Sequence, residues 1–147
     1  MKRPKFKIIS VDDLKKAVID LMKDYEEIRL LYLYGSYAKG LQTEFSDIDI
    51  GIVIDENFEE PPLYAAEVSS AIEKEFDYKI NIDLKILNKA KPRFLFKVIQ
   101  NNIILYIKDY KFMYEFELKT ISFYQEIKPM LDAYDKMTIM EVLGDGN

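Results

Sequence analysis

Asp47 and Asp49 are the two side chains in this sequence whose types and spacing most directly indicate chemistry. They alternate with isoleucines at positions 48, 50, 52 and 54, which is the period-two pattern of a β-strand. A strand would point both carboxylates to the same face, where their like charges repel unless a cation neutralises them. A divalent ion such as Mg²⁺ would do so. The alternative is a pair of solvated aspartates on an exposed edge.

A third carboxylate, Asp83, lies on the polar side of a second alternating stretch, residues 79–87. If the two strands are neighbours in the sheet, Asp83 shares the face of the first two aspartates. Three carboxylates can hold two metal ions about 4 Å apart, one activating an attacking oxygen and the other a leaving pyrophosphate. The alternative is an exposed aspartate that forms an ion pair with Lys79 or Lys85.

A candidate phosphate-binding turn precedes these aspartates. Gly35 and Ser36 directly follow a dense β-branched and aromatic run at residues 28–34, and Gly40 ends the short helical turn after them. Without a Cβ at Gly35 a phosphate can approach the backbone, where free N–H groups and the Ser36 hydroxyl would bind it. Lys39 in the same turn is the candidate for a direct phosphate contact. A plain strand-to-helix turn is the alternative.

The stretch from Lys85 to Lys108 contains no acidic residue and six basic ones. A basic stretch that begins beside the third carboxylate could hold a triphosphate or an acidic partner surface. It could equally be a solvated helix face. The basic residues are Lys85, Lys89, Lys91, Arg93, Lys97 and Lys108.

Composition removes several other chemistries. The 147 residues include no histidine, cysteine or tryptophan, which excludes disulfides, thiolate zinc sites and an imidazole general base within this chain. The net charge of −5 argues against direct nucleic-acid binding. No apolar run approaches the roughly 20 residues that span a bilayer, and no apolar signal segment follows Met1. We therefore expect a cytoplasmic protein with no membrane contact.

The elements that must position these residues follow from hydrophobic spacing and capping residues. The order of predicted helices and strands along the chain indicates an α+β fold: a small mixed sheet with helices on one side and a helical C-terminal tail. We expect residues 1–109 to form one domain and residues 110–147 a helical extension packed on it. Predicted strands are residues 28–34, 47–54, 79–87 and 103–107; predicted helices are residues 10–25, 61–76, 92–100 and 110–143, with Pro129 expected to kink or break the last.

The order of these motifs resembles the nucleotidyltransferase signature of the DNA polymerase beta superfamily. Gly35-Ser36 is followed after ten residues by Asp47-Ile48-Asp49, and Asp83 comes on a later strand. The resemblance implies a polymerase-beta-like fold with ATP bound over the turn and Mg²⁺ as the metal cofactor. It implies metal-binding and catalytic roles for Asp47, Asp49 and Asp83, and nucleotide-binding roles for Gly35, Ser36, Lys39 and Ser46.

The short chain and its tail, residues 116–129, also resemble the minimal nucleotidyltransferases that act as antitoxins to HEPN toxins. That resemblance implies AMPylation: transfer of AMP from ATP to a tyrosine hydroxyl of a HEPN partner, in a type VII toxin–antitoxin pair. The family often has Arg where Lys39 stands, which keeps the charge but changes the phosphate contact.

Two other functions stay open at this point. The protein could be a non-catalytic antitoxin that neutralises by binding through its aromatic helical tail, or a nucleotidyltransferase that acts on a small molecule. The short chain disfavours the second, because it leaves no sizeable further domain to shape a small-molecule pocket. About half of the tail aromatics are expected to be core residues, and a homo-oligomer is compatible with the sequence.

Overall fold

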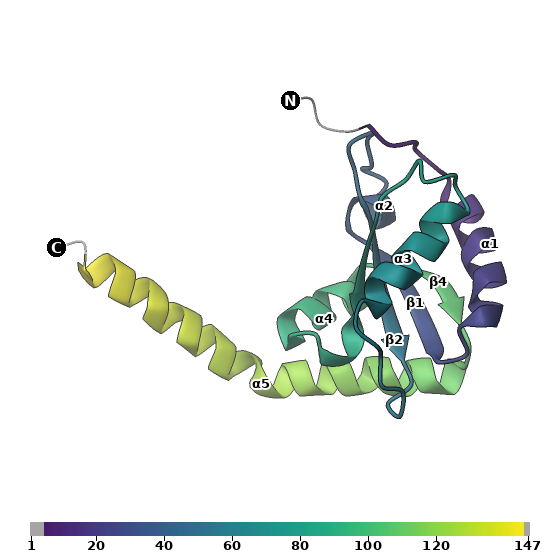
Figure 1. Cartoon of the computed structure of the whole chain (residues 1–147). Coiled ribbons are helices and arrows are strands. Elements are labelled where there is room, and N and C mark those ends of the chain that lie inside the picture. Colours follow the sequence, from purple (N-terminus) through teal and green to yellow (C-terminus); the bar gives the residue numbers. More distant parts are fainter. Residues whose placement is uncertain (1–4, 146–147) are drawn as a thin grey trace.

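The computed structural model describes residues 5–145 and has a four-stranded sheet between two layers of helices (Figure 1). The strand order is β3-β2-β1-β4. The strands are β1 (Ile28–Tyr34), β2 (Ile48–Ile54), β3 (Ile82–Ile86) and β4 (Ile103–Ile107). The helices are α1 (Val11–Leu21), η1 (Met22–Asp24), α2 (Gly35–Lys39), α3 (Tyr64–Lys74), η2 (Leu87–Lys89), α4 (Pro92–Gln100) and α5 (Tyr110–Asp145).

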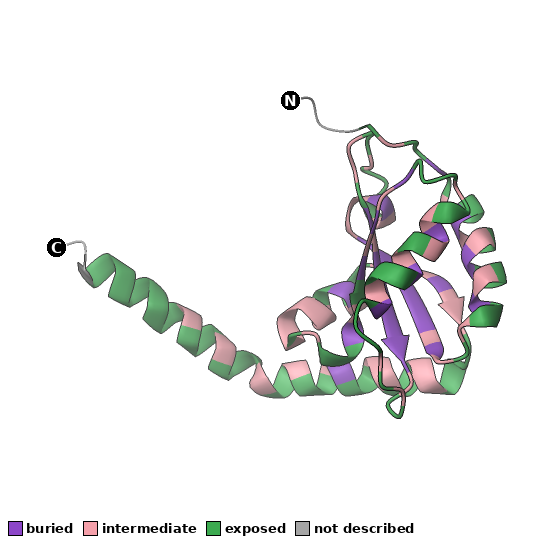
Figure 2. Cartoon of the chain, viewed as in Figure 1, coloured by how far each residue is buried: buried purple, intermediate pink, exposed green. Residues whose placement is uncertain are grey.

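The sheet is mixed, as the sequence predicts. β1 is antiparallel to both β2 and β4, whereas β2 and β3 are parallel and are connected through α3. Parallel neighbours require such a crossover. β1 and β2 are the two central strands, and both are buried along almost their whole length (Figure 2).

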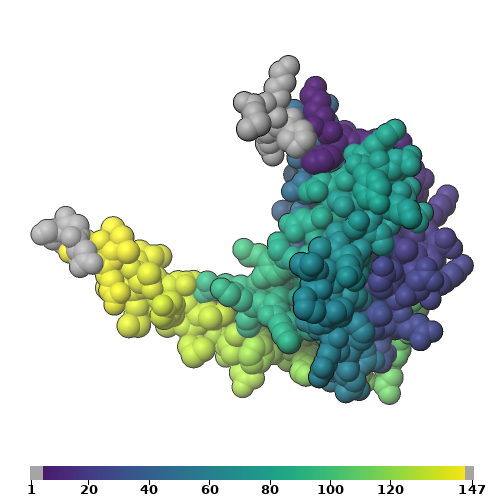
Figure 3. Space-filling model, in the orientation of Figure 1, coloured from purple at the N-terminus to yellow at the C-terminus, as the bar shows by residue number. Residues whose placement is uncertain are grey.

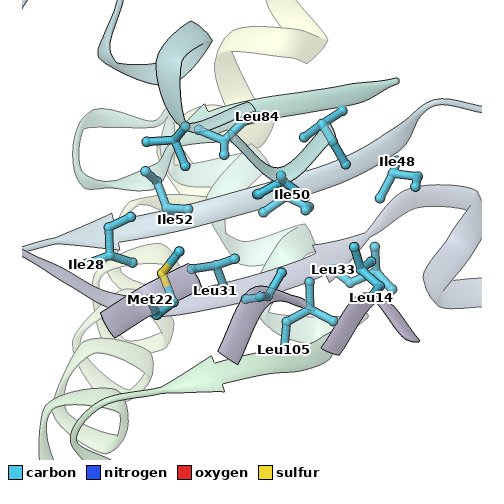
Figure 4. Close-up of a cluster of buried hydrophobic side chains, with 14 of the residues drawn as sticks. Leu14, Met22, Ile28, Leu31, Leu33, Ile48, Ile50, Ile52, Leu84 and Leu105 are labelled. Carbon is cyan, nitrogen blue, oxygen red and sulfur yellow. The ribbon is translucent and has the colours of Figure 1, made fainter. Parts of the chain in front are cut away.

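The first helical layer, α1 and α3, covers one face of the sheet. Ser10 caps α1: its Oγ accepts a hydrogen bond from the Asp13 backbone N–H at 3.0 Å. Leu14 and Val18 on α1 are fully buried, in the same cluster as the isoleucines of β2. Figure 4 shows this cluster, in which Leu14, Met22, Leu31, Ile50 and Leu84 meet from different elements.

A second helical layer covers the other face, so the expectation of helices on one side is correct for α1 and α3 but wrong for α4 and α5. Leu30 and Tyr32 of β1 and Val53 of β2 point to this second face and are buried there. Apolar side chains on both faces of the central strands require cover on both. The helix α4 and the first half of α5 supply that cover.

The helix α5 continues through Pro129 and changes direction about midway, which agrees with the predicted kink (Figure 1). Its first half packs on the sheet through Phe112, Met113 and Phe116. Its second half extends away from the body of the protein as an exposed arm (Figures 2 and 3). Within residues 5–145, no helix combines the length and apolarity needed to cross a bilayer. The division of the chain into residues 1–109 and 110–147 stays a prediction. The first four residues of the one segment and the last two of the other lie outside the described residues.

Candidate functional site

Strand register places two of the three predicted carboxylates side by side. Asp49 of β2 pairs with Asp83 of the parallel strand β3, and on its other side with Tyr34 of β1. The three side chains form a row across the sheet on the face that α4 covers. The two aspartate-bearing strands are therefore neighbours, which is the condition under which the sequence places Asp83 on the face of Asp49.

The electrostatics of this row reflect the crowding of negative charge. Burial is the largest cause that raises the pKa of Asp49, and the charge of Asp83 adds to it, giving a value of about 6. The charge of Asp47 and a hydrogen bond with Asp83 raise it further, whereas Lys85 lowers it. Two carboxylates this close repel each other, and their oxygen atoms are the ligands that a hard divalent cation prefers.

Asp47 lies just before β2 and is exposed. Its Oδ1 accepts a hydrogen bond from Nδ2 of Asn81 at 2.9 Å, and Asn81 stands two residues before Asp83. In the part of the chain that the structure describes, no three acidic side chains form a cluster that could hold a metal ion. The structure thus brings Asp49 and Asp83 together, whereas Asp47 is hydrogen-bonded to Asn81.

Lys85 provides a cation at the same place. Its Nζ lies 3.7 Å from Oδ2 of Asp83 and 5.2 Å from the centre of the Phe94 ring on α4. This is one of the two lysine pairings that the sequence left open for Asp83. Beside it is a cavity of about 430 Å³, with Lys85, Lys89 and Lys91 among its lining residues. Three residues of the basic stretch therefore line one hollow, and one of them, Lys85, is paired with Asp83.

The Gly35 turn lies directly against Asp49. Gly35 opens α2 with φ +71°, a backbone conformation that favours glycine. A Cβ on Gly35 would overlap Oδ2 of Asp49 and lie 3.1 Å from its Cγ. The glycine thus brings the backbone of the turn into contact with a carboxylate. Ser36 is half-buried next to it, and Lys39 is exposed at the end of α2.

The hydroxyl oxygen and the backbone N–H of Ser46 both form hydrogen bonds with Thr43 in the same loop. Its Oγ accepts a hydrogen bond from the Thr43 backbone N–H at 2.8 Å, and the Ser46 N–H donates to the Thr43 carbonyl at 3.0 Å. These bonds shape the loop between α2 and β2. Its predicted role as a nucleotide contact stays a prediction.

Tyr34 is a residue that the sequence reasoning missed. Its hydroxyl is buried, and among the described residues 5–145 it has no hydrogen-bond partner. Burial raises the pKa of Tyr34, and so do the nearby charges of Asp49 and Asp83. Its ring meets Phe94 edge-on at 5.5 Å. A buried hydroxyl without a partner costs free energy unless a ligand satisfies it. It is therefore a candidate ligand contact.

Comparison with known protein families decides the identity of this site. The family described as polymerase beta, nucleotidyltransferase matches residues 16–111, well over half of the chain. The chain belongs to the polymerase beta nucleotidyltransferase family. The matched range contains the Gly35 turn and all three predicted carboxylates. The predicted family and fold are confirmed, and so is the enzyme class at the level of the family.

Two relatives come from Methanocaldococcus jannaschii. One, named "Putative protein adenylyltransferase MJ1379", is 51% identical over 37 residues, which are 25% of this chain and 37% of that protein. The match therefore spans little more than a third of that relative's length. The other, named "Putative protein adenylyltransferase MJ1305", is 29% identical over 117 residues, 79% of this chain and 78% of that protein.

Solved structures give the same fold over most of the nucleotidyltransferase chain. One, described as a toxin–antitoxin with AMP-PNP, has a TM-score of 0.72 and 25% identity, and covers 85% of this chain and 98% of that chain. Another is described as the tri-AMPylated Shewanella oneidensis HEPN toxin in complex with MNT antitoxin. It has a TM-score of 0.69 at 22% identity, and covers 88% of this chain and 98% of that chain.

Two residues of this site, Tyr34 and Asn81, had weak signals in the nucleotidyltransferase sequence. Tyr34 directly precedes Gly35, and Asn81 precedes Asp83 by the two-residue period of a strand. Asn81 could be placed on the face of Asp83 from spacing alone, whereas the face of Tyr34 could not be assigned, because residues 28–34 show no alternation. Their contacts depend on the register between strands, which spacing within one strand does not determine.

Proposed function

We propose that this protein is an Mg²⁺-dependent nucleotidyltransferase that transfers AMP from ATP to a tyrosine hydroxyl of a HEPN-family partner protein, as the antitoxin of that pair. The observation that carries the proposal is the contact between the Gly35 turn and the Asp49–Asp83 pair. A phosphate-binding backbone and two metal-binding carboxylates must lie this close if a bound triphosphate is to reach the metal.

The carboxylates fit a magnesium site, with Asp49 and Asp83 beside each other and Asp47 at the same end of β2. Magnesium bound there would neutralise charge on the triphosphate and favour ionisation of the acceptor hydroxyl. In the transfer, the acceptor oxygen bonds to the α-phosphorus of ATP and the bond to pyrophosphate breaks. We assign Asp83 to receive the acceptor proton. Lys85, which forms an ion pair with Asp83, would exchange this contact for one with phosphate.

The triphosphate has two candidate contacts besides the metal. The Gly35–Ser36 backbone offers N–H donors at the start of α2, with Lys39 at its end. The hollow lined by Lys85, Lys89 and Lys91 offers three ammonium groups, of which that of Lys85 lies beside Asp83. The hydroxyl of Tyr34, buried without a partner among the described residues, can donate to a ligand oxygen at the carboxylates.

The acceptor and partner are proposed from the relatives. Both M. jannaschii relatives carry the name of protein adenylyltransferases, and a solved relative is an MNT antitoxin bound to an AMPylated HEPN toxin. The shared fold over nearly the whole of that antitoxin chain supports a similar arrangement here.

Label transfer tests the function. The chain is incubated with ATP labelled at the α-phosphate, Mg²⁺ and the HEPN-family protein encoded beside it. We expect label on the partner, loss of label with EDTA, and loss when the partner's acceptor tyrosine is replaced by Phe. An Asp47→Ala/Asp49→Ala variant should transfer none, because it lacks two of the metal ligands. The matched control, Asp24→Ala/Glu75→Ala, removes two exposed carboxylates elsewhere and should transfer normally.

The other outcomes separate the alternatives. Tight association without label, unchanged in the Asp47→Ala/Asp49→Ala variant, would mean a non-catalytic antitoxin. Label that appears on an added small molecule but never on the partner would mean a small-molecule nucleotidyltransferase. Label on a protein residue other than tyrosine would keep the transfer and correct the acceptor.

A further inference from the structure

A larger groove lies toward the opposite end of β2 from Asp49, and neither Asp49 nor Asp83 lines it. It shares Ile86, Lys89 and Ala90 with the smaller hollow beside Lys85. It is a hollow of about 920 Å³ between the loop that follows β2, the segment that follows β3, and the first half of α5. Asp49 stands near the start of β2 and the groove near its end. Val53, the nearest lining residue on β2, is four residues from Asp49, roughly 13 Å at 3.3 Å per residue. On β3, Ile86 is three residues from Asp83, roughly 10 Å. A ligand in this groove would therefore leave the carboxylates free.

The floor of the groove is apolar and its rim is acidic. Floor residues include Val53, Leu95, Phe112, Phe116 and Phe123. Of the acidic lining residues, Asp55 is paired with Arg29 at 3.1 Å. The other acidic lining residues form no ion pair within residues 5–145, and they outnumber the two lysines, Lys89 and Lys119. They are Glu56, Glu59, Glu60 and Glu115.

Beyond the groove, α5 carries further exposed apolar side chains on the arm that follows the bend at Pro129. Phe116, Phe123, Met130 and Met137 follow one another at intervals of seven residues, with Tyr134 between the last two. Phe116 is half-buried, whereas Phe123 is 51% exposed and Met130, Tyr134 and Met137 are 62–69% exposed. A seven-residue apolar repeat is typical of a helix that packs against another helix. We call the groove, together with these exposed side chains at the same seven-residue spacing, the docking surface.

We propose that this surface binds an amphipathic helix of another protein, one with an apolar face flanked by Lys and Arg. Seven-residue spacing along α5 favours a helix as the occupant, and the unpaired glutamates of the rim favour basic flanks. The same charges disfavour a second copy, because each copy carries a net charge of −5 and would bring an acidic arm to an acidic rim. They also disfavour an anionic lipid surface.

This inference goes beyond the proposed function, since nothing in it depends on Asp47, Asp49 or Asp83. A partner bound here would contact this protein at a surface that does not include Asp47, Asp49 or Asp83. Such docking would raise the local concentration of any acceptor on the same partner.

Fluorescence anisotropy with a designed peptide tests the docking surface. The probe is a labelled helix of about three heptads with Leu at a and d and Lys on its flanks. We expect saturable binding to the full chain. Binding should weaken about tenfold in Glu56→Lys/Glu115→Lys and at least as much in Phe123→Asp, which changes an exposed side chain. The matched charge control is Asp24→Lys/Glu75→Lys, which should bind like the unmodified chain.

Further measurements distinguish other occupants and other failures. A peptide with the same apolar face and Glu flanks should bind at least tenfold more weakly, and Asp47→Ala/Asp49→Ala should bind the Lys peptide unchanged even if label transfer is absent. Equal binding by the groove and control variants would overturn the proposal. So would self-association of the chain that Phe123→Asp abolishes, which would make a second copy the occupant. Binding to phosphatidylserine vesicles, lost in Phe123→Asp, would overturn it in favour of a membrane.

Discussion

The two ends of strand β2 are built in different ways. At the Asp49 end, a turn, a carboxylate pair and a tyrosine hydroxyl are packed so closely that one added carbon at Gly35 would overlap Asp49. At the Ile54 end, a wide groove opens between a glutamate-rich loop and α5, and its floor is made of large apolar side chains. The same strand thus carries a closely packed carboxylate site at one end and lines a wide apolar groove at the other.

This difference determines which kind of substitution each end tolerates. Close contacts make the carboxylate end sensitive to displacements well below the size of a side chain. The groove end depends on apolar area and on several separate charges, so single changes there have graded effects. We therefore expect large, position-specific losses at the first end and smaller losses at the second.

Replacing Gly35 by Ala is expected to give the largest effect. The new Cβ must displace the Asp49 carboxylate, and a misplaced metal ligand should lower label transfer at least about a hundredfold. Stability should fall as well, by roughly 1–2 kcal/mol for the left-handed φ and about 1 kcal/mol more for crowding. Urea unfolding and the label-transfer assay measure the two effects.

Gly40→Ala is the matched control for that prediction. Gly40 has φ +70°, almost the same as Gly35, but nothing lies within 4 Å of where its Cβ would be. It should show the backbone strain alone, with label transfer close to normal. If both alanine variants lose the same transfer activity, contact between Gly35 and Asp49 is not what the site requires.

The pH dependence of Asp49 is expected to give a smaller effect. Its pKa of about 6 lies above the ordinary value of 3.8. The folded protein therefore holds a proton that the unfolded chain releases. The stability this proton adds is full below pH 4 and is lost as the pH rises to 6. In buffer with EDTA, Asp49→Asn should thus gain stability over the unmodified chain across that range, by about 1 kcal/mol for a partly exposed group.

Titration of the Asp49 carboxyl carbon by NMR would sharpen this prediction. Asp83→Asn removes the nearest negative charge and should lower the pKa of Asp49. An Asp49 carboxyl that titrates near 3.8 in the metal-free chain would contradict the crowding described here.

Much of the carboxylate end could be predicted from sequence because its signals are local. The strand Ile28–Tyr34, the helix Pro92–Gln100 and the strand Ile103–Ile107 were predicted with the bounds that the structure has. Apolar runs bounded by Gly, Pro or Asn define such elements within a short window. The two-residue period placed Asp49 and Asp83 on the polar face of their own strands, and they share one face because the strands are neighbours.

The remaining features depend on contacts between distant residues. The overlap of Gly35 with Asp49 and the absence of a partner for Tyr34 among the described residues follow from how β1 and β2 align. The second helical layer follows from where α4 and α5 pack, which their own periodicity does not specify. The groove has no signature in any single segment, because three separate segments form it.

Two tyrosines of β1 give the smallest and most direct test of the comparison. Tyr32 and Tyr34 point to the same face, but the Tyr32 hydroxyl donates to Oε1 of Glu117 on α5 at 3.0 Å. Tyr32→Phe should cost about 1 kcal/mol of stability, because it leaves a half-buried carboxylate without that bond. Tyr34→Phe removes a hydroxyl that has no partner among residues 5–145, and should leave stability equal or slightly higher. Urea unfolding of both variants measures this contrast.

Because a ligand at the carboxylates could accept a hydrogen bond from Tyr34 but not from Tyr32, only Tyr34→Phe should also weaken ATP binding, by several-fold in calorimetry. If Tyr34→Phe lost stability and bound ATP normally, its hydroxyl would belong to the packed interior and not to the nucleotide site.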